Sequence, residues 1–252
     1  MNRIVLITGA TSGIGRATAV ALSQNNFDII ITGRRKELLE DLKKEIKEIS
    51  SCNIHILNFD VRNKEEVDQA IDSLPEKWQD IDVLVNNAGL AVGLEHINEG
   101  VVDDWERMID TNVKGLLYVT RKVVPGMVAK KHGHIINIGS TAGKEAYEKG
   151  NVYCGTKHAV DAITKGMRID LLQHKIKVTA INPGMVETEF SVVRFKGDKE
   201  KANKVYQGFT PLYGKDVADA LLYVVTRPEH VCINDMIITA TAQANSFFKV
   251  TE

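Results

Sequence analysis

Short apolar runs alternate with longer segments of helical periodicity along this 252-residue chain, and this alternation limits its fold more than any other feature. The runs are almost continuously apolar, which is typical of parallel strands covered on both faces. Alternating strands and crossover helices predict a doubly wound α/β sheet, and a chain of this length can bury one large core. We therefore expect a single domain over residues 1–252, with strands at residues 4–7, 27–33, 53–59, 81–85, 134–138, 175–181 and 236–239.

A glycine-rich turn follows the first predicted strand and precedes a helix over residues 16–22. The residues of interest in this turn are Gly9, Ser12, Gly13, Ile14 and Gly15. Glycines let backbone amides approach a pyrophosphate, and the helix N-terminus adds partial positive charge. The spacing is G-x-x-x-G-x-G, not the more general G-x-G-x-x-G. Because the turn follows the first strand, a dinucleotide site is favoured over a tight turn without a ligand.

Two arginines, Arg34 and Arg35, follow the second strand, about 20 residues after the glycines. NAD enzymes present a carboxylate to the ribose hydroxyls at this position. A carboxylate repels a 2′-phosphate, whereas guanidinium groups bind it through charge-assisted hydrogen bonds. The pair therefore predicts NADP as the cofactor. The alternative is that both arginines are solvated at the start of a helix over residues 37–49.

Polar and small residues follow the next two strands as well. Asp60 and Val61 end the third run, where they are placed to touch an adenine edge. Asn87, Ala88 and Gly89 follow the fourth run, where an amide can tie neighbouring loops together and small residues leave room for a cofactor ring. Because ligands of open α/β sheets bind beyond the carboxyl ends of the strands, we expect these residues to border the dinucleotide site.

A serine, a tyrosine and a lysine form the candidate catalytic group. Ser140 stands at the carboxyl end of the strand over residues 134–138, and Tyr153 and Lys157 lie four residues apart on one face of a predicted helix. Lowering a phenol pKa from about 10 to about 7 needs ~4 kcal/mol, and one positive charge ~5 Å away supplies ~3 kcal/mol at an effective dielectric of ~20. With Lys157 and one further cation, such as an oxidised nicotinamide, Tyr153 would act as acid and base for an alcohol while Ser140 bonds the same oxygen.

The Tyr-x-x-x-Lys spacing occurs a second time, in Tyr118 and Lys122. Trp105 stands thirteen residues before Tyr118, whereas Ser140 stands thirteen residues before Tyr153. We therefore expect the first pair to serve the surface or packing. Asn112 interrupts the long helix predicted over residues 103–131, and it is either a satisfied core amide or a functional one.

The composition limits the kinds of partner and the compartment that we expect for this protein. Charged residues nearly cancel to a formal net charge of -1, so neither nucleic acid nor a membrane surface is indicated, and a small molecule is the expected partner. No apolar stretch reaches the ~18 residues that span a bilayer. Three scattered cysteines without a C-x-x-C pair fit a reducing compartment, so we expect a cytoplasmic protein. His132 and His134 have no third ligand at suitable spacing, so no metal site is expected.

These motifs, in this order, resemble the short-chain dehydrogenase/reductase family. The resemblance implies a Rossmann-type domain with a seven-stranded, mostly parallel sheet. It also implies a catalytic tetrad: Asn112 would hold a water of the proton relay, Ser140 would orient the substrate, Tyr153 would be the acid/base, and Lys157 would tune Tyr153 and bind the ribose. In the same family, the backbone at Val186 and the hydroxyl of Thr188, in a segment that begins with Pro183 and Gly184, would bind the nicotinamide carboxamide.

A narrower likeness involves residues 139–143, 184–191, 193–195, 205–208, 211–212 and 227–231. They look like the NADP-dependent serine and 3-hydroxy acid dehydrogenases, whose substrates are serine, allo-threonine, 3-hydroxypropionate or, in reverse, malonic semialdehyde. The polar residues 187–213 are typical of a substrate lid. On this lid we expect Arg194 to pair with the substrate carboxylate, the alternative being an unrelated surface arginine.

The sequence is also compatible with two other functions and with assembly into a homotetramer. The same tetrad would serve an NADPH-dependent reductase of neutral aldehydes and ketones, and the same fold would serve an NADP-sensing protein without turnover. The helices over residues 103–131 and 151–173 have long apolar faces, through which the family commonly forms homotetramers. The alternative for these faces is burial against the chain's own sheet.

Overall fold

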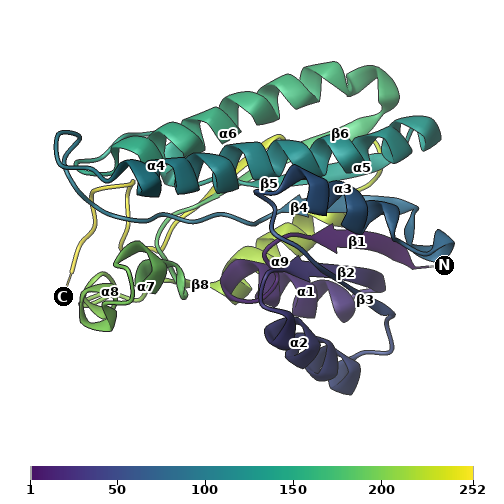
Figure 1. The fold of residues 1–252 in the computed structure, drawn as a ribbon, viewed down its shortest axis with the longest axis horizontal. Coiled ribbons are helices and arrows are strands. Elements are labelled where there is room, and N and C mark those ends of the chain that lie inside the picture. Colours follow the sequence, from purple (N-terminus) through teal and green to yellow (C-terminus); the bar gives the residue numbers. More distant parts are fainter. Residues whose placement is uncertain (1, 252) are drawn as a thin grey trace.

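The computed structural model describes residues 2–251. Its core is a seven-stranded sheet in the order β3-β2-β1-β4-β5-β6-β9, and every neighbouring pair is parallel (Figure 1). The strands are β1 Arg3–Ile7, β2 Phe27–Gly33, β3 Ile54–Asn58, β4 Ile81–Asn86, β5 Gly133–Ile138, β6 Ile176–Pro183 and β9 Asp235–Ile238. The predicted Rossmann-type sheet and its seven strands are thus confirmed, with shifts of one or two residues at strand ends.

Helices cover both faces of this sheet. On one face lie α1 Gly13–Ser23, α2 Lys36–Ile49 and α9 Gly214–Val225; on the other lie α3 Lys64–Asp72, α4 Val102–Ile109, α5 Leu116–Lys130 and α6 Asn151–Asp170 (Figure 1). Successive strand residues point to opposite faces, so Val5 and Ile7 enter one apolar cluster while Ile4 and Leu6 enter the other. Two covered faces explain why the strands are continuously apolar.

The strand order reverses at β1, which has β2 on one side and β4 on the other. Loops that leave the carboxyl ends of these two strands diverge, and they open a crevice between them. The glycine turn follows β1 and residues 87–89 follow β4, so both predicted cofactor segments meet at this crevice. The topology alone therefore fixes where a ligand can enter.

The long helix predicted over residues 103–131 is interrupted, as expected, at its centre. The π-helix η2 Asp110–Gly115 joins α4 to α5, and Asn112 lies inside it. A π-turn widens the helix and shifts the direction of the side chains that follow it, and such turns are frequent at functional sites. The amide of Asn112 is therefore placed by an irregular turn and not by regular helix packing.

The predicted lid over residues 187–213 contains secondary structure that its polar composition did not indicate. It contains α7 Phe190–Arg194 and α8 Lys199–Lys204, and it is bracketed by a short parallel pair, β7 Val186–Glu187 and β8 Leu212–Tyr213. Figure 1 shows α7 and α8 below the sheet end, near the C-terminus. Among residues 2–251, no helix combines the length and apolar character required to cross a membrane.

Candidate active site

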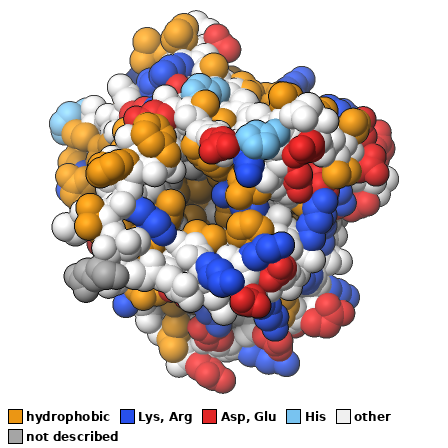
Figure 2. All heavy atoms as spheres, turned by 90° about the vertical axis from the view of Figure 1, so that its left-hand side faces the viewer, with side chains coloured by type: hydrophobic (Ala, Val, Ile, Leu, Met, Phe, Trp, Pro, Cys, Tyr) orange, Lys and Arg blue, Asp and Glu red, His pale blue; other side chains and the backbone are white. Residues whose placement is uncertain are grey.

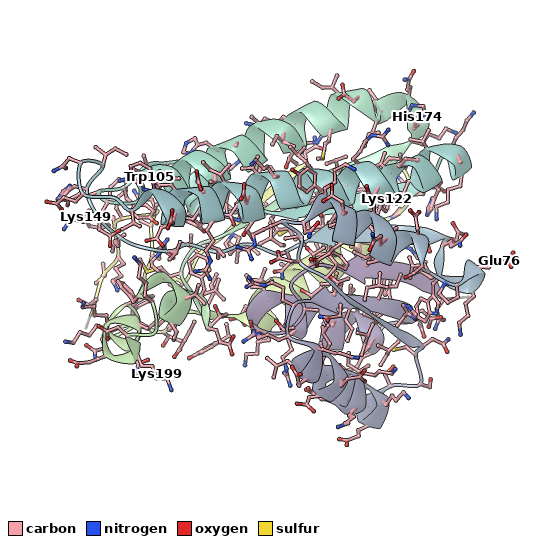
Figure 3. The ribbon with its side chains drawn as sticks, in the orientation of Figure 1. Glu76, Trp105, Lys122, Lys149, His174 and Lys199 are labelled. Atoms are coloured by element: carbon pink, nitrogen blue, oxygen red, sulfur yellow. The ribbon has the colours of Figure 1, made fainter. Side chains whose placement is uncertain are left out.

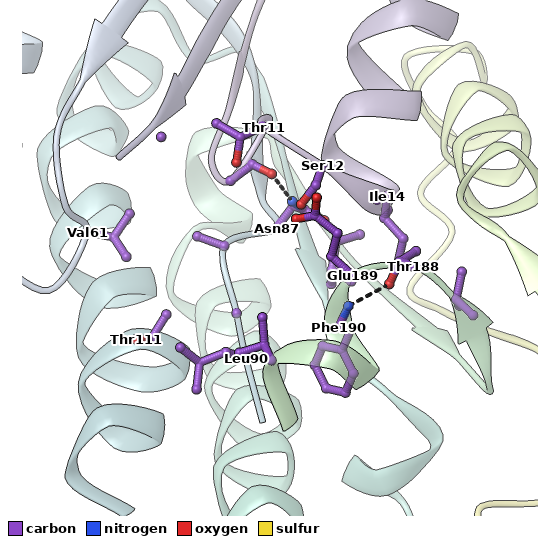
Figure 4. A pocket seen from close by; sticks show the side chains of 18 of the residues that line it. Thr11, Ser12, Ile14, Val61, Asn87, Leu90, Thr111, Thr188, Glu189 and Phe190 are labelled. Carbon is purple, nitrogen blue, oxygen red and sulfur yellow. Dashed lines mark hydrogen bonds between the residues drawn. The ribbon is translucent and has the colours of Figure 1, made fainter. Parts of the chain in front are cut away.

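A cavity of about 340 Å³ lies at the carboxyl ends of the strands. Figure 4 shows its lining, and Figure 2 shows the end of the molecule on which α7 and α8 lie, with a hollow near the centre of the face. It is lined by most residues predicted for the cofactor and by three of the tetrad: Gly9, Ser12, Gly13, Ile14, Arg34, Arg35, Asp60, Val61, Asn87, Ala88, Gly89, Ser140, Tyr153, Lys157, Pro183, Gly184, Val186 and Thr188. Gly15, Asn112 and Arg194 do not line it.

The glycine turn has the shape that a pyrophosphate requires. Gly9 and Gly13 have φ of +66° and +54°, a left-handed conformation that other residues rarely adopt. Helix α1 begins at Gly13 without a side-chain cap and without an acid in its first turn, so its positive end faces the cavity unneutralised. Gly15 has a packing role instead, because a Cβ there would lie 2.4 Å from Asn87 Nδ2 and from the Gly9 carbonyl.

The two predicted phosphate-binding arginines border the cavity on its open side. Arg35 donates to the hydroxyls of Thr11 and Ser12 at 3.0 and 3.1 Å and pairs with Glu189, directly before α7, at 2.9 Å. Arg34 lies 3.7 Å from a carboxylate oxygen of Asp60. Burial raises the pKa of Asp60, but hydrogen bonds from Arg62 outweigh it and lower the pKa overall. The cluster therefore presents two guanidinium groups, held by hydroxyls and carboxylates, at the border of the cavity.

Amide side chains tie the strand-end loops together, as the sequence predicted. Asn87 Nδ2 donates to the carbonyls of Thr8 and Gly9 at 2.9 and 3.1 Å, and the Thr8 hydroxyl accepts the backbone N–H groups of Asn87 and Ala88 at 3.0 Å. A Cβ on Gly9 would lie 2.9 Å from the Ala88 Cα. The β1 turn and the β4 turn are therefore fixed against each other, with little room for any other residue.

Ser140 is placed by hydrogen bonds on both sides of its residue. It directly follows Gly139 beyond β5, its backbone N–H donates to Asn182 Oδ1 at 3.2 Å, and its hydroxyl accepts from the Ala142 N–H at 3.1 Å. Its hydroxyl caps the 3₁₀ helix η3 Thr141–Gly143, which packs on α6 so closely that a Cβ on Gly143 would lie 2.7 Å from the Lys157 carbonyl. This close approach brings Ser140 to the face of α6 that carries Tyr153.

Tyr153 and Lys157 are both buried on α6. Lys157 Nζ donates to the Ile138 carbonyl at 2.8 Å, and burial lowers its pKa to about 8. Burial also raises the pKa of Tyr153 well above its ordinary value; Arg194 and a hydrogen bond from Ser140 act in the opposite direction but do not outweigh it. Among the charged side chains near the phenol, Arg194 of α7 is the one that favours its ionised form.

Asn112 is a satisfied amide. Its Oδ1 accepts from the Leu90 N–H at 2.8 Å, and its Nδ2 donates to the Leu90 carbonyl and the Thr156 hydroxyl at 2.8 and 3.0 Å. The side chain thus joins the loop after β4 to the helix α6. Both hydrogens of the amide are in use, whereas its oxygen has accepted one bond and can accept a second.

Arg194 lies among aromatic rings beside the catalytic group. Its guanidinium carbon is 4.9 Å from the centroid of Tyr153, 5.2 Å from that of Phe190 and 5.9 Å from that of Tyr147, whose hydroxyl accepts from Nη2 at 2.8 Å. Its Nε is buried and has no hydrogen-bond partner within residues 2–251. Arg194 is therefore not an unrelated surface arginine: it presents a buried donor next to Tyr153.

Several cavity residues were not foreseen from the sequence. They are Thr11, Gly33, Phe59, Leu90, Arg107, Thr111, Ile138, Gly139, Glu189, Phe190 and Val193. Arg107 lies in the last turn of α4, and Thr111 lies one helical turn later, inside the π-helix. The sequence had indicated this irregular region only through Asn112. Phe190 and Val193 belong to α7, and the Phe190 N–H donates to the Thr188 hydroxyl at 3.2 Å (Figure 4). Within the described residues, no group of three or more acidic, histidine or cysteine side chains is arranged for a metal ion.

The fold and the site together define a Rossmann-type protein with a dinucleotide-shaped cavity and a buried Ser, Tyr and Lys group at one end of it. The chain belongs to the short chain dehydrogenase family, whose model matches residues 3–199. It is 49% identical over 242 residues to the NADP-dependent 3-hydroxy acid dehydrogenase YdfG of Escherichia coli, with 96% of each chain covered. It is 40% identical to an NADP-dependent 3-hydroxy acid dehydrogenase of Schizosaccharomyces pombe, covering 97% and 95%.

A solved structure gives the same result in three dimensions. The closed form of serine dehydrogenase complexed with NADP+ superposes with a TM-score of 0.93 at 48% identity and covers 99% of both chains. The family and the fold predicted from the motifs are thereby confirmed.

Proposed function

We propose that this protein is an NADP-dependent oxidoreductase that transfers hydride between NADP and a small 3-hydroxy acid of the serine, allo-threonine and 3-hydroxypropionate class. The observation that carries the substrate class is Arg194, a cation 4.9 Å from the Tyr153 ring with a buried, unpartnered Nε among the described residues. A carboxylate one or two carbons from the reacting carbon would satisfy this donor. The names of the relatives at 40–50% identity support the same class.

The residues of the cavity fit an NADP molecule. The left-handed glycines and the open N-terminus of α1 would bind the pyrophosphate, and Arg34 and Arg35 would bind the 2′-phosphate. Pro183 and Gly184 begin the segment in which the Val186 backbone and the Thr188 hydroxyl would bind the carboxamide. When bound, the nicotinamide supplies the site that gives or accepts the hydride.

Tyr153 would donate a proton to the carbonyl oxygen in reduction and take it back in oxidation. Burial keeps the phenol protonated, which is the form that donates, while Arg194 and Ser140 favour the phenolate that must follow. Ser140 would donate a hydrogen bond to the same substrate oxygen, its hydroxyl turning from Tyr153 to the substrate while its oxygen still accepts from the Ala142 N–H. Lys157, one helical turn further along α6, would tune Tyr153 and bind the ribose.

Asn112 would hold a water of the proton relay. Its side-chain amide also joins the π-helix to the loop after β4 and to α6, through its bonds to Leu90 and Thr156.

A substrate comparison tests the class. With NADP present, we expect a 3-hydroxy acid to react with a far higher kcat/KM than its methyl ester, because the ester cannot pair with Arg194. The Arg194→Met variant should raise KM for the acid by roughly 10- to 100-fold, as for loss of a charge-assisted bond. The Lys201→Met variant removes an exposed lid lysine as a control. An unchanged KM in Arg194→Met would contradict the assignment.

Two alternatives make different predictions in the same experiment. A reductase of neutral carbonyls would accept the ester and the acid equally. A sensor without turnover would bind NADPH tightly yet reduce no carbonyl in a broad panel. The placement of Tyr153, Ser140 and Lys157 around one cavity supports catalysis over sensing, because a protein that only binds has no need of a buried phenol there.

We also propose that the chain forms a homotetramer in a reducing compartment, the cytoplasm. Exposed apolar side chains support association: Val102, Ile109 and Leu117 lie along α4 and α5, and Ile169 lies at the end of α6. Three unpaired cysteines support the compartment. Light scattering coupled to size exclusion would give the mass of the assembly, and a monomer at micromolar concentration would contradict the first proposal.

A further inference from the structure

Gln243 is a buried polar residue in the C-terminal segment, distant in sequence from every residue assigned above. It is 4% exposed, and its Oε1 accepts a hydrogen bond from the Met185 backbone N–H at 2.8 Å. Met185 lies within residues 183–188, the turn that is proposed to bind the carboxamide. The side chain thus reaches from the end of the chain to the backbone of the cofactor turn.

The approach of Gln243 explains why position 184 is a glycine. A Cβ on Gly184 would lie 2.2 Å from Gln243 Oε1, closer than any two such atoms can come. Gly184 is not among the glycines with positive φ, so its backbone conformation does not itself demand glycine. The space that the missing side chain leaves is occupied by the Gln243 amide.

The turn is held by three separate elements. The Gly184 N–H donates to the Ile238 carbonyl of β9 at 2.8 Å, and the Met185 carbonyl accepts from the Leu212 N–H of β8 at 3.1 Å. Gln243 satisfies the remaining main-chain donor of this pair, the Met185 N–H. Without the glutamine, that part-buried N–H loses its partner, or the turn must move to find another.

The glutamine is itself held rigidly. Its Nε2 donates to the Asn245 carbonyl at 2.8 Å, and Asn245 Oδ1 accepts the backbone N–H groups of Phe247 and Phe248 at 3.1 and 2.7 Å. The segment closes through an antiparallel bridge between Gln243 and Lys249, whose ammonium donates to the Val205 carbonyl beyond α8 at 2.7 Å. The acceptor offered to Met185 is therefore preorganised, and it is not the end of a flexible tail.

We propose that Gln243 is a positioning residue for the nicotinamide end of the cofactor site. It fixes the backbone at Gly184 and Met185, so that the groups at Val186 and Thr188 keep the direction in which they bind the carboxamide. The inference rests on the proposed role of residues 183–188. It adds the C-terminal segment to the site, on the basis of contacts that no motif in the sequence revealed.

The experiment compares two ligands that share one end. NADPH carries the nicotinamide, whereas 2′,5′-ADP has the adenosine and its 2′-phosphate only. Binding of each is measured by calorimetry to the full chain and to Gln243→Met, which fills the volume without a strong acceptor, and Gln243→Ala. We expect the Kd of NADPH to rise roughly tenfold, the change for one lost buried hydrogen bond, while the Kd of 2′,5′-ADP stays within about twofold.

A matched control is available in the same chain. Gln79 Nε2 donates to the Leu74 carbonyl at 2.9 Å, far from the cavity, so Gln79→Ala also removes a glutamine hydrogen bond to the main chain and should leave both affinities unchanged. Equal weakening of both ligands by Gln243→Met, or no weakening of either, would overturn the proposal. Wild-type turnover of hydroxy acids is scored separately: its absence would sink the proposed function, whereas an unchanged ratio of the two affinities sinks only the role of Gln243.

Discussion

Two Tyr-x-x-x-Lys pairs occur in this chain, and both lie on long helices that cover the same face of the sheet. On α5, Tyr118 packs half-buried against the second core cluster, and Lys122 forms an ion pair with Asp72 of α3 at 2.7 Å. Figure 3 labels Lys122 on the right of the view and Lys199, the first residue of α8, at its lower left. On α6, Tyr153 and Lys157 are both buried at the cavity, and Lys157 bonds a main-chain carbonyl in place of a carboxylate.

The surroundings of each helix account for this difference, since the spacing is identical. Helix α5 faces α3, whose acidic residue neutralises the lysine. Helix α6 faces the end of β5 and the 3₁₀ helix η3, where no carboxylate among the described residues pairs with Lys157 and Ser140 is held against the phenol. A charge left unneutralised in a buried place is costly, and a fold retains it where function requires it.

The largest expected effect distinguishes the two tyrosines. Tyr153→Phe should lower kcat for a 3-hydroxy acid by roughly 10²–10⁴-fold, the usual loss for a general acid/base, with the Kd of NADPH nearly unchanged. Tyr118→Phe should leave kcat within about twofold. Stopped-flow binding and steady-state rates on both variants measure this. Comparable activity in the two variants would remove the distinction between the pairs.

Replacing Lys157 should also lower activity more than replacing Lys122, but the difference should be smaller than for the two tyrosines. Lys157→Met removes the ammonium beside Ile138 and Gly89, so we expect kcat/KM to fall by roughly 10²-fold, partly through weaker cofactor binding. Lys122→Met loses only a surface ion pair and should keep its full rate. NADPH titration by fluorescence would show the binding component. A fully active Lys157→Met enzyme would contradict the assigned role.

The fold and the location of the site were predictable because both follow from local patterns. Continuous apolar runs mark buried parallel strands, and the carboxyl ends of such strands converge, so Asn87, Ser140 and Thr188 could be placed at one cavity from their positions after strands. The Tyr118 pair could be set aside for the same reason, because no serine on a strand end precedes it at the right distance.

What could not be predicted depends on contacts between segments far apart in sequence. Tyr147 and Arg194 are 47 residues apart and meet only through the lid, and their meeting makes Arg194 the cation beside Tyr153. The bond from Met185 to Gln243 spans 58 residues. Neither has a motif or a period. Helix α7 was not predicted because it has few apolar side chains. Two of them, Phe190 and Val193, pack against the cluster around Tyr153 and not against the main core.

The pH dependence of the free energy of unfolding should show how much the burial of the charged Lys157 destabilises the fold. Burial lowers the pKa of Lys157 to about 8 in the folded protein, below the ~10.4 of an unfolded chain. Between these values the unfolded chain holds a proton that the folded chain lacks, so wild-type stability gains from rising pH; below pH 8 the full cost of burying the charge is present. Lys157→Met should therefore be more stable than wild type near pH 7, by about 1–3 kcal/mol after the lost bond to Ile138 is counted.

That advantage should shrink as pH rises from 8 to about 10.5, where the folded lysine is already neutral. Urea unfolding at several pH values in this window measures it, with Lys122→Met as the control for removing a lysine as such. A Lys157→Met protein that is less stable than wild type at pH 7 would show that the buried ammonium is not a burden on the fold.

The smallest effect is expected at the first pair itself. The Lys122 side chain is 25% exposed and the Asp72 side chain 68%, so water and salt screen their attraction, and Lys122→Met should change the free energy of unfolding by less than about 1 kcal/mol. Raising the ionic strength to about 1 M should remove most of that difference, because the Debye length then falls to about 3 Å, close to the 2.7 Å between the two charged atoms. Urea unfolding of both proteins at low and high salt measures this. A loss above about 2 kcal/mol that persists in high salt would contradict this contrast between a surface lysine and a buried one, because methionine keeps most of the packed side chain and only the ion pair is removed.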